Sequence, residues 1–419
     1  MAARPLTVID CDGSPAAAHA VSAGLAHALD DPAAPAVLAV AAAPAARSRL
    51  LAALRPGDPA DERTALLLAT SGSSGRPKGV ELPGAALLAS ARATHERLGG
   101  AGGWLLALPV QHVAGVQVLT RSLVAGRPPA VLDLRGGFDP DAFAAAAAGM
   151  PAGRRYTALV PTQLLRLLDA GGAGLRALLG FDAVLVGGAA CPAALLASAR
   201  AAGIAVVTTY GMTETAGGCV YDGRPLRSVR MRIGGPAGTS RDGPAGSDHD
   251  GPAASGRVEL AGPMLALGYR LDTARASRAA TEAAFRGGWF RTGDHGRLTA
   301  DGRLDVLGRL DEVIVTGGLK VAPAAVEAAL IEAGGVAEAC VVGLPDAEWG
   351  ELVAAAVVAR DPARPPEPAA LRSAARELAG AYAVPKLIRI VPALPRTGPG
   401  KIDRAGVREL LTGPRPGVT

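Results

Sequence analysis

The sequence predicts an α/β protein with a large N-terminal domain and a small C-terminal one. Its 419 residues exceed the usual size of a single domain. Short apolar runs alternate with Ala-rich helical patterns, and this rhythm changes near residue 310. Because apolar runs of this kind are buried on both faces, they predict mainly parallel sheets with helical crossovers.

The strands expected in the large domain are apolar runs that end in Gly, Pro or Thr. Each run is followed by a helix-like stretch, and the loops after such strands are where ligands bind in α/β folds. The expected strands are Ala65–Ala69, Trp104–Leu108, Tyr156–Val160, Ala183–Val186 and Ile204–Thr208.

The small domain is expected to be α+β, with about 110 residues. Gly302–Leu307, just before it, alternates polar and apolar residues like part of a β-hairpin. A Gly-Gly turn then follows the first strand of the domain. Its expected elements are a strand at Glu312–Thr316, a helix from Pro323 to about Ala333, and strands at Ala339–Gly343 and Leu352–Ala359.

Composition excludes several classes of function. The net charge is +5 with only 3% aromatic residues, and the arginines are scattered, so a nucleic-acid-binding surface is not expected. The four cysteines stand far apart without a CxxC pair, which argues against a zinc site or a disulfide framework. No apolar run is long enough for a signal peptide or a membrane span, so a cytoplasmic protein without membrane contact is expected.

One stretch is poor in apolar residues. Gly238–Gly256 is rich in Gly, Pro, Ser and Asp and predicts a mobile surface insertion. Its Asp248-His249-Asp250 is interpreted as part of a solvated loop, because nothing there would hold metal ligands rigid.

A glycine- and hydroxyl-rich segment predicts a phosphate loop. Thr70–Val80 reads TSGSSGRPKGV and follows a strand-like run. Glycines let backbone N–H groups wrap an anion, while hydroxyls and a lysine add donors and charge. The order of residues does not fit a Walker A loop, which needs its Lys after the last Gly and a helix starting there. A plain surface loop is the alternative; the residues predicted to bind phosphate are Thr70, Ser71, Gly72, Ser73, Ser74, Gly75 and Lys78.

This string resembles the signature of the adenylate-forming superfamily, which includes acyl-CoA synthetases, luciferases and peptide-synthetase adenylation domains. Companion segments follow in the family's order, and the resemblance runs from about residue 64 almost to the end. They are Val184–Pro192, Thr208–Thr215, Trp289–Gly296, Gly308–Pro323 and Pro395–Arg404.

The resemblance implies the adenylate-forming fold with a shortened N-terminal region. Layered α/β subdomains would form an ATP- and acid-binding domain at 1–308. A hinge at 309–311, centred on Asp311, would lead to a small mobile domain at 312–419. The implied reaction joins a small carboxylic acid to CoA through an acyl-AMP intermediate, with ATP and Mg²⁺. A homodimer is also implied.

Residue roles follow from the same resemblance. Tyr210, beside Gly211, would stack on adenine, against which the small Gly187, Gly188 and Ala189 would let the base lie. Asp294 and Arg309 would hold the ribose hydroxyls.

Catalysis is assigned to three residues. Thr213 would donate to the α-phosphate and Glu214 would be the Mg²⁺ ligand. Lys401 would stabilise the charge that develops when a carboxylate attacks the α-phosphorus. Gly317 and Gly318 would lie beside the pantetheine tunnel, unless they form a simple turn.

The acid substrate is indicated by a non-core segment. Pro109–Gly126 carries His112-Val113-Ala114-Gly115 where amino-acid-activating relatives usually have an Asp. Together with Tyr210–Gly223, it resembles the 2-succinylbenzoate–CoA ligases of menaquinone biosynthesis, particularly compact actinobacterial forms. His112 would then bind the second carboxylate, unless it is a core histidine. Gly217, Gly218 and Cys219 would shape the aryl pocket.

Other readings stay open at this stage. They are another aryl- or acyl-CoA ligase, a stand-alone adenylation enzyme that loads a carrier protein, and a degenerate nucleotide-binding protein. The presence of Glu214, Asp294, Arg309 and Lys401 argues against the last of these.

Overall fold

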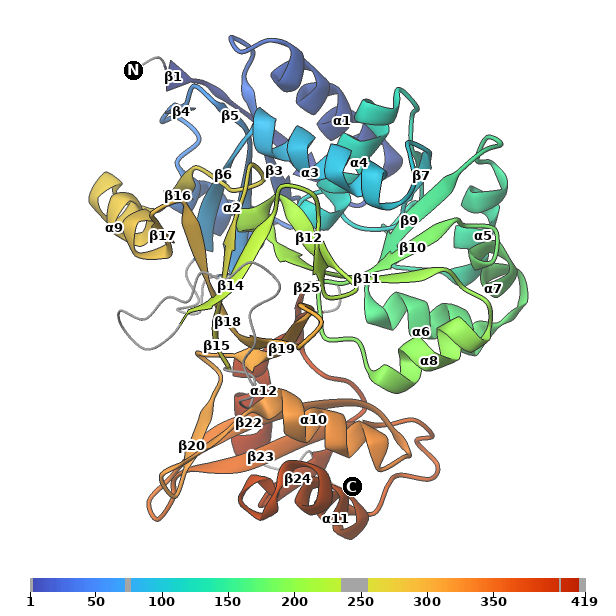
Figure 1. Cartoon of the computed structure of the whole chain (residues 1–419), viewed down its shortest axis with the longest axis vertical. Helices are drawn as coiled ribbons and strands as arrows, with labels where there is room; N and C mark the ends of the chain where they lie inside the picture. Colours follow the sequence, from blue (N-terminus) through green and yellow to red (C-terminus); the bar gives the residue numbers. More distant parts are fainter. Residues whose placement is uncertain (1–2, 72–76, 235–254, 399–400, 414–419) are drawn as a thin grey trace. The chain divides into compact units, whose positions relative to one another are not determined.

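The computed structural model describes residues 3–71, 77–234, 255–398 and 401–413 (Figure 1). The chain divides into two compact units. One comprises 1–232, 259–292 and 302–304, and the other comprises 233–258, 293–301 and 305–419. The hinge at 309–311 stays a prediction. Most of the expected insertion at Gly238–Gly256 lies outside the described residues.

The first unit contains a seven-stranded sheet in the order β13-β12-β11-β10-β9-β7-β8. Strands β7 to β11 run parallel, whereas β12 and β13 are added antiparallel at one edge. The strands are β7 (Gly103–Leu106), β8 (Ala130–Val131), β9 (Arg155–Leu159), β10 (Ala183–Val186), β11 (Val206–Met212), β12 (Gly217–Tyr221) and β13 (Arg224–Pro225).

A second sheet of the same unit has the order β16-β6-β5-β3-β2. Here β2, β3 and β5 are parallel, and β6 and β16 are antiparallel. Its strands are β2 (Leu6–Cys11), β3 (Ala36–Ala41), β5 (Thr64–Ser71), β6 (Pro77–Pro83) and β16 (Gly268–Arg270); β1 (Ala3–Arg4) pairs separately with β4 (Ala60–Asp61).

Nine helices among the described residues accompany these sheets. Several begin with Pro at the first helical turn, where the missing N–H costs no hydrogen bond. They are α1 (Pro15–Asp30), α2 (Pro44–Leu54), α3 (Gly84–Arg97), α4 (Val113–Ala125), α5 (Pro140–Ala148), α6 (Pro161–Ala170), α7 (Gly172–Leu178), α8 (Ala193–Ala201) and α9 (Ala274–Ala284).

The largest core joins both sheets to α1, α3 and α4. Trp104 and Tyr156 from the seven-stranded sheet, Leu66 from β5 and Val118 from α4 are all buried in it. A separate core packs α5 to α8 against the opposite face of the seven-stranded sheet around Phe143. One face of α3 and most of α4 are therefore buried, so the polar residues at those positions are removed from solvent.

A third sheet has the order β14-β15-β18-β17, with β19 paired to β18. Its strands are β14 (Arg230–Gly234), β15 (Ser255–Ala261), β17 (Phe285–Arg286), β18 (Trp289–Leu298) and β19 (Leu304–Arg309).

The second unit contains a sheet of order β21-β20-β23-β22, with β24 beside β23. It packs on α10 and α11 through a core around Val326, Val341 and Leu371. The elements are β20 (Ile314–Thr316), β21 (Leu319–Val321), α10 (Pro323–Glu332), β22 (Val336–Asp346), β23 (Gly350–Ala359), α11 (Pro368–Ala379), β24 (Leu387–Ile390), β25 (Arg396–Gly398), β26 (Lys401–Ile402) and α12 (Arg404–Thr412).

The predicted α/β architecture is confirmed, with one correction. The runs at Ala65–Ala69 and Ile204–Thr208 are strands, but helices do not follow them. Each leads instead into an antiparallel partner, β5 into β6 and β11 into β12. After β11 the chain reverses at η1 and Gly217, which has φ +95. Alternation of apolar runs alone does not distinguish a reversal from a crossover.

Candidate functional site

The predicted phosphate loop connects two antiparallel strands. Thr70 pairs with Lys78, and the Thr70 hydroxyl donates to the Lys78 carbonyl over 3.4 Å. Residues 72–76 and the Ser71 side chain lie outside the described residues. Because β6 follows the loop, the segment does not have the helix that a Walker A loop requires.

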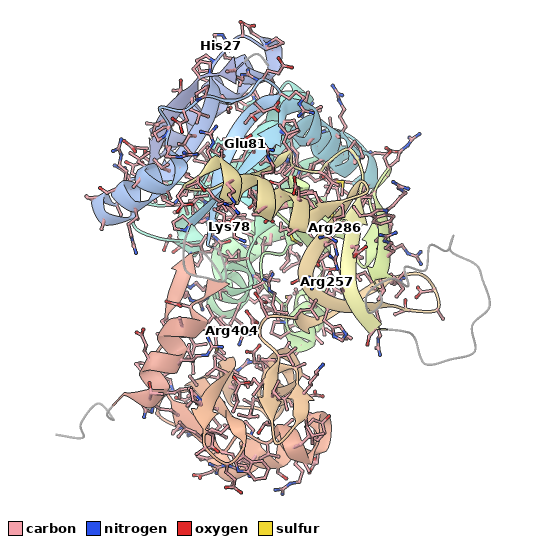
Figure 2. All side chains as sticks on the ribbon, turned by 90° about the vertical axis from the view of Figure 1, so that its left-hand side faces the viewer. His27, Lys78, Glu81, Arg257, Arg286 and Arg404 are labelled. Carbon is pink, nitrogen blue, oxygen red and sulfur yellow. The ribbon has the colours of Figure 1, made fainter. Side chains whose placement is uncertain are left out.

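Three side chains from distant parts of the sequence meet next to this loop. The Lys78 ammonium lies 5.2 Å from the centre of the Tyr269 ring, and the Tyr269 hydroxyl donates to Glu214 Oε1 over 2.9 Å. Lys78 and Glu214 were predicted to be functional, whereas Tyr269 was missed. Its only signal was an aromatic residue after Gly268 in a chain with few aromatics. Figure 2 labels Lys78 on β6.

Glu214 sits on a single 3₁₀ turn, η1 (Thr213–Thr215), between β11 and β12. The turn is held by Thr215, whose hydroxyl accepts from Met212 N over 2.9 Å and donates to the Gly217 carbonyl over 2.8 Å. Thr213 and Glu214 are half-buried while Thr215 is buried. The buried hydroxyl therefore fixes the turn and leaves its two neighbours partly open to a ligand.

Tight backbone packing explains several glycines of the predicted site. A Cβ at Gly211 would lie 2.2 Å from the Gly217 carbonyl oxygen, and one at Gly187 would lie 2.2 Å from Thr209 Oγ1. Gly187 thus packs closely against β11, and its expected role beside the adenine base stays a prediction. Gly188 has φ +80, and a Cβ there would lie 3.5 Å from Val160 Cγ1, an ordinary contact distance.

The predicted ribose residues belong to one ion-pair network. Arg309 makes a two-pronged contact with Asp311, at 2.9 and 3.0 Å, and reaches Asp294 Oδ1 at 3.3 Å. Asp294 is buried, and Gly293 has no Cβ because one would lie 2.7 Å from Arg309 Nη2. The hydrogen bonds with Asp311 raise the pKa of Arg309, so the guanidinium stays charged.

Gly317 and Gly318 form the turn between β20 and β21. Both have positive φ, +55 and +78, which only glycine adopts readily in succession. A Cβ at Gly317 would lie 2.9 Å from the Trp349 ring, whereas Gly318 has open space. Lys386 Nζ lies 5.1 Å from the centre of the same ring. The simple turn is therefore real, and it stands beside an exposed aromatic and a cation.

Lys401 lies in β26, where it pairs with Gly398. Its side chain is outside the described residues. Three residues later, Arg404 pairs with Glu312 at 2.9 Å and with Glu327 at 2.8 Å, and donates to the Val341 carbonyl over 2.6 Å. Arg404 thus ties the motif that carries Lys401 to β22, α10 and the start of the small sheet.

On the acid side, His112 is the N-cap residue of α4 and is exposed, so it is not a core histidine. Gly115 in the same turn is required, since a Cβ would lie 2.3 Å from the Pro109 carbonyl oxygen. The HVAG segment therefore bends the chain tightly against the end of β7 and presents His112 at the surface.

Farther along α4, polar residues are buried on one face. Gln117 is 1% exposed and Arg121 is 3% exposed, and their spacing of four places them on adjacent turns. Neither amide atom of Gln117 nor Nε of Arg121 has a hydrogen-bond partner, and Ser90 Oγ on α3 also lacks one. Such buried polar atoms are rare unless they serve water or a ligand. A Cβ at Gly217, one of the predicted substrate residues, would lie 2.9 Å from Gln117 Cγ.

Arg121 is the charged member of a buried cluster. Its Nη2 donates to the Tyr221 hydroxyl over 3.2 Å, and its guanidinium lies 4.9 Å from the centre of the Trp104 ring. Trp104 Nε1 donates to His95 Nε2 over 3.1 Å, so His95 is neutral. Burial and then the nearby Arg121 lower the pKa of His95 to about 4, and burial lowers the pKa of Arg121 itself. Sequence reasoning missed this cluster.

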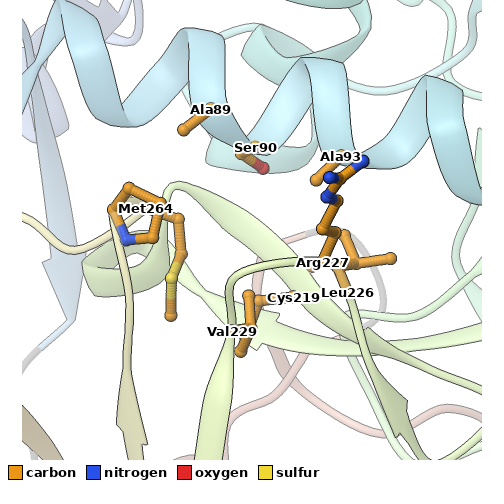
Figure 3. A pocket seen from close by; sticks show the side chains of 10 residues that line it. Ala89, Ser90, Ala93, Cys219, Leu226, Arg227, Val229 and Met264 are labelled. Atoms are coloured by element: carbon orange, nitrogen blue, oxygen red, sulfur yellow. The ribbon is translucent and has the colours of Figure 1, made fainter.

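A small pocket lies between α3 and β12. In Figure 3, Ala89, Ser90 and Ala93 line one side from α3, while Cys219 and Val229 line the other. Gly218 also belongs to the lining, so two of the residues predicted to shape the aryl pocket border a hollow. Burial raises the pKa of Cys219 to about 12, which keeps this thiol protonated and apolar in character.

Two searches of the described residues were negative. No cluster of three or more His, Cys, Asp or Glu side chains could hold a metal ion by itself. No helix in the described part of the chain combines the length and apolar character needed to cross a membrane.

Comparison with protein families gives two matches. The model for "AMP-binding enzyme" matches residues 5–270, and that for "AMP-binding enzyme C-terminal domain" matches residues 325–401.

Individual proteins match over most of their length. The chain is 43% identical over 400 residues to the probable 2-succinylbenzoate–CoA ligase of Mycobacterium tuberculosis (strain CDC 1551 / Oshkosh), which covers 94% of this chain and 98% of the relative. It is 33% identical to 2-succinylbenzoate–CoA ligase of Listeria monocytogenes serotype 4b (strain F2365), which covers 83% and 70%. The structure of o-succinylbenzoate CoA synthetase from Bacillus subtilis, in complex with the acyl-adenylate intermediate OSB-AMP, aligns at a TM-score of 0.75 and 24% identity, covering 99% of this chain and 89% of that one.

Proposed function

The chain belongs to the AMP-binding enzyme family, and we propose that it ligates 2-succinylbenzoate to CoA at the expense of ATP. The observation that carries the proposal is 43% identity to a probable ligase of this kind over 94% of this chain and 98% of the relative. Such coverage includes both family regions and the segment from Pro109 to Gly126, which bears the acid-side residues.

The reaction has two balanced steps. A carboxylate oxygen of the acid forms a bond to the α-phosphorus of ATP, and the bond to pyrophosphate breaks. The CoA thiol then loses its proton and attacks the acyl carbonyl, and AMP leaves with the electron pair of the broken C–O bond. The products are the acyl-CoA, AMP and pyrophosphate.

The nucleoside would be held by residues from β11 and from the Asp294 network. Tyr210 is half-buried at the end of β11 and offers a ring face to adenine, beside the backbone of Gly188 and Ala189. Asp294 can accept hydrogen bonds from ribose hydroxyls, and Arg309 is already oriented by its contacts with Asp294 and Asp311.

The donor set around Glu214 fits magnesium bound together with ATP. Glu214 is half-buried, and the described residues contain no group of three or more His, Cys, Asp or Glu side chains that could hold a metal ion. A single carboxylate suits magnesium, which prefers one or two carboxylates, with phosphate oxygens and water completing the shell. Magnesium, when bound, supplies positive charge against the phosphate oxygens. Thr213 offers its hydroxyl beside Glu214, and Lys78 with the loop from Thr70 would bind the remaining phosphate charge.

The second unit would supply the catalytic lysine and the CoA contact. Lys401 would stabilise the negative charge between the attacking carboxylate and the α-phosphate. Gly318, at the tip of the β20–β21 turn, has space for a thiol-bearing chain to pass, and Lys386 on Trp349 offers a cation nearby. Asp311 would be the hinge, and its ion pair with Arg309 would then link hinge position to nucleotide contact.

The buried polar face of α4 supports a dianionic acid. Among the described residues, no carboxylate pairs with Arg121, and the Gln117 amide is also without a partner. Ser90 and the Gly218–Cys219 backbone border the pocket of Figure 3. Gln117 and Arg121 are not among the residues that line this pocket. A second carboxylate that reached them would meet positive charge and N–H donors, while His112 would act from the exposed start of α4.

Pyrophosphate release across a panel of acids, with and without CoA, tests the proposal. We expect 2-succinylbenzoate to give the highest kcat/KM and a stable acyl-CoA product. Much faster turnover of benzoate, cinnamate or simple fatty acids would refute 2-succinylbenzoate as the substrate, but the assignment as an acid–CoA ligase would stand. Acyl-AMP formation without transfer to CoA would favour an enzyme that loads a carrier protein. The proposal extends to a homodimer in the cytoplasm, which sedimentation and cell fractionation would check.

A further inference from the structure

The contacts of Tyr269 have no role in the reaction described above. We propose that Tyr269 is a positioning residue for the phosphates and magnesium of bound ATP, because it lies between Lys78 and Glu214 and holds each in place. The Lys78 ammonium lies 5.2 Å from the centre of its ring, and its hydroxyl donates a hydrogen bond to Glu214 Oε1 over 2.9 Å. This inference rests on the proposed ATP-dependent function.

The chemistry of a tyrosine suits this position. Lys78 and Glu214 carry opposite charges and, if they met directly, would neutralise each other and lose their use to a ligand. The Tyr269 side chain lies between Lys78 and Glu214 and so keeps them from forming a direct ion pair. Its ring face attracts the ammonium without a hydrogen bond, which leaves all three N–H donors available to phosphate. Its single O–H binds one carboxylate oxygen and leaves the other for magnesium.

The backbone around Tyr269 is fixed from one side by α9. Tyr269 N donates to Thr281 Oγ1 over 2.9 Å, and Gly268 allows the approach because a Cβ there would lie 2.6 Å from the same oxygen. Tyr269 also pairs with Val80 across β16 and β6. Lys78, two residues before Val80, is therefore its diagonal neighbour on the same face of the sheet.

The residues on either side of Tyr269, from Ala266 to Arg270, are also held by hydrogen bonds. Ala266 N donates to the Glu214 carbonyl over 2.9 Å, so the backbone of Glu214 is held by the same segment as its side chain. At the other end, buried Arg270 pairs with Glu81 at 3.0 Å and donates to the Asp58 carbonyl over 2.8 Å. A ring held at this many points can set the positions of Lys78 and Glu214 instead of following them.

Titration calorimetry of the full chain separates the two contacts. Tyr269→Phe keeps the ring for Lys78 and loses the hydroxyl, whereas Tyr269→Leu loses both. We expect Phe to reduce, by about 3- to 10-fold, the gain in ATP affinity that magnesium confers, which is the range for the loss of one ordinary hydrogen bond. We expect Leu to weaken magnesium-ATP binding at least tenfold. AMP, which lacks the β- and γ-phosphates, should bind both variants as it binds wild type.

Control measurements keep the outcomes distinct. Tyr382→Phe removes a hydroxyl from a tyrosine that is 52% exposed and should behave as wild type. Absence of magnesium-ATP binding by wild type would refute the proposed function itself. Wild-type binding with an unchanged magnesium effect in Tyr269→Phe would overturn the positioning role, and so would an equal loss of AMP affinity. If Tyr269→Leu does not fold in a thermal melt, the Phe variant decides alone.

Discussion

Arg121 and Arg404, one in each compact unit, are both largely shielded from solvent, but only one of them is paired with carboxylates. Arg404 in the second unit has Glu312 and Glu327 within 2.9 Å. Arg121 in α4 has a tyrosine hydroxyl and an indole ring, and no carboxylate among the described residues. Burial acts to lower the pKa of both. The charges of Glu327 and Glu312 outweigh burial at Arg404 and raise its pKa, whereas the pKa of Arg121 stays lowered.

The difference teaches where to look for function. A buried cation that is paired with carboxylates has its charge neutralised within the folded chain, and its removal would leave unpaired carboxylate charges behind. A buried cation without an anion costs stability that the fold does not recover by itself. Such a group is a candidate for binding an anionic ligand.

Lys401, three residues before Arg404, should give the largest effect. Lys401→Ala should slow acyl-AMP formation by about 10²–10³, or about 3–4 kcal/mol, because a charge contact present mainly in the transition state is lost. The free energy of unfolding should change by less than about 0.5 kcal/mol. Single-turnover assays of each half-reaction measure this, with preformed acyl-AMP bypassing most of the defect. An equal defect in both half-reactions would remove Lys401 from its role; Lys401→Arg, which retains the charge, is the matched control.

Arg404→Met should act on stability. Glu312 and Glu327 would lose their partner in a largely buried site, which costs about 3 kcal/mol, the lower end for broken buried pairs because the Glu312 side chain is 30% exposed. Urea denaturation of the full chain measures the loss. Adding Glu312→Gln and Glu327→Gln to Arg404→Met should recover most of it. A stable single variant would contradict the assignment of Arg404 to structure.

His95 makes the Arg121 region sensitive to pH. Its pKa is about 4 in the folded chain against 6.5 ordinarily, so the unfolded chain takes up the proton first as pH falls. Stability is therefore complete above about pH 6.5 and declines by about 3 kcal/mol as the pH falls to 4. Denaturation at pH 7 and pH 4.5 should show a smaller decline for His95→Gln, whose amide can still accept from Trp104. The exposed His27→Gln should match wild type, and an identical decline in all three proteins would refute the linkage.

The sequence alone predicts the residues that stand in contiguous motifs better than those whose role depends on tertiary contacts. Lys401, Glu214 and the phosphate loop stand in contiguous strings whose glycines and charges are visible without a structure. Tyr269 was not visible, because its role depends on the register of β16 against β6. The partners of Arg404 likewise come from elements far apart in the sequence. For Gln117 and Arg121 a signal did exist, namely two polar residues four apart on an otherwise apolar helix, but only the packing of α3 and α4 shows that both are buried.

Arg121→Met should change stability far less than Arg404→Met does. Met keeps much of the volume and removes the buried charge, while the contacts with Tyr221 and Trp104 are lost. Because these terms oppose each other, the free energy of unfolding should change by less than about 1 kcal/mol. If Arg121 supports the second carboxylate, KM for 2-succinylbenzoate should rise about tenfold, or about 1.4 kcal/mol. The value of kcat should stay within about twofold, since that carboxylate does not react and is bound equally in ground and transition states. KM for ATP should not change, and Arg92→Met, at an exposed position of α3, should leave all constants as in wild type. A loss of more than about 3 kcal/mol of stability with an unchanged KM for the acid would make Arg121 a structural cation like Arg404. The contrast between the two arginines would then disappear.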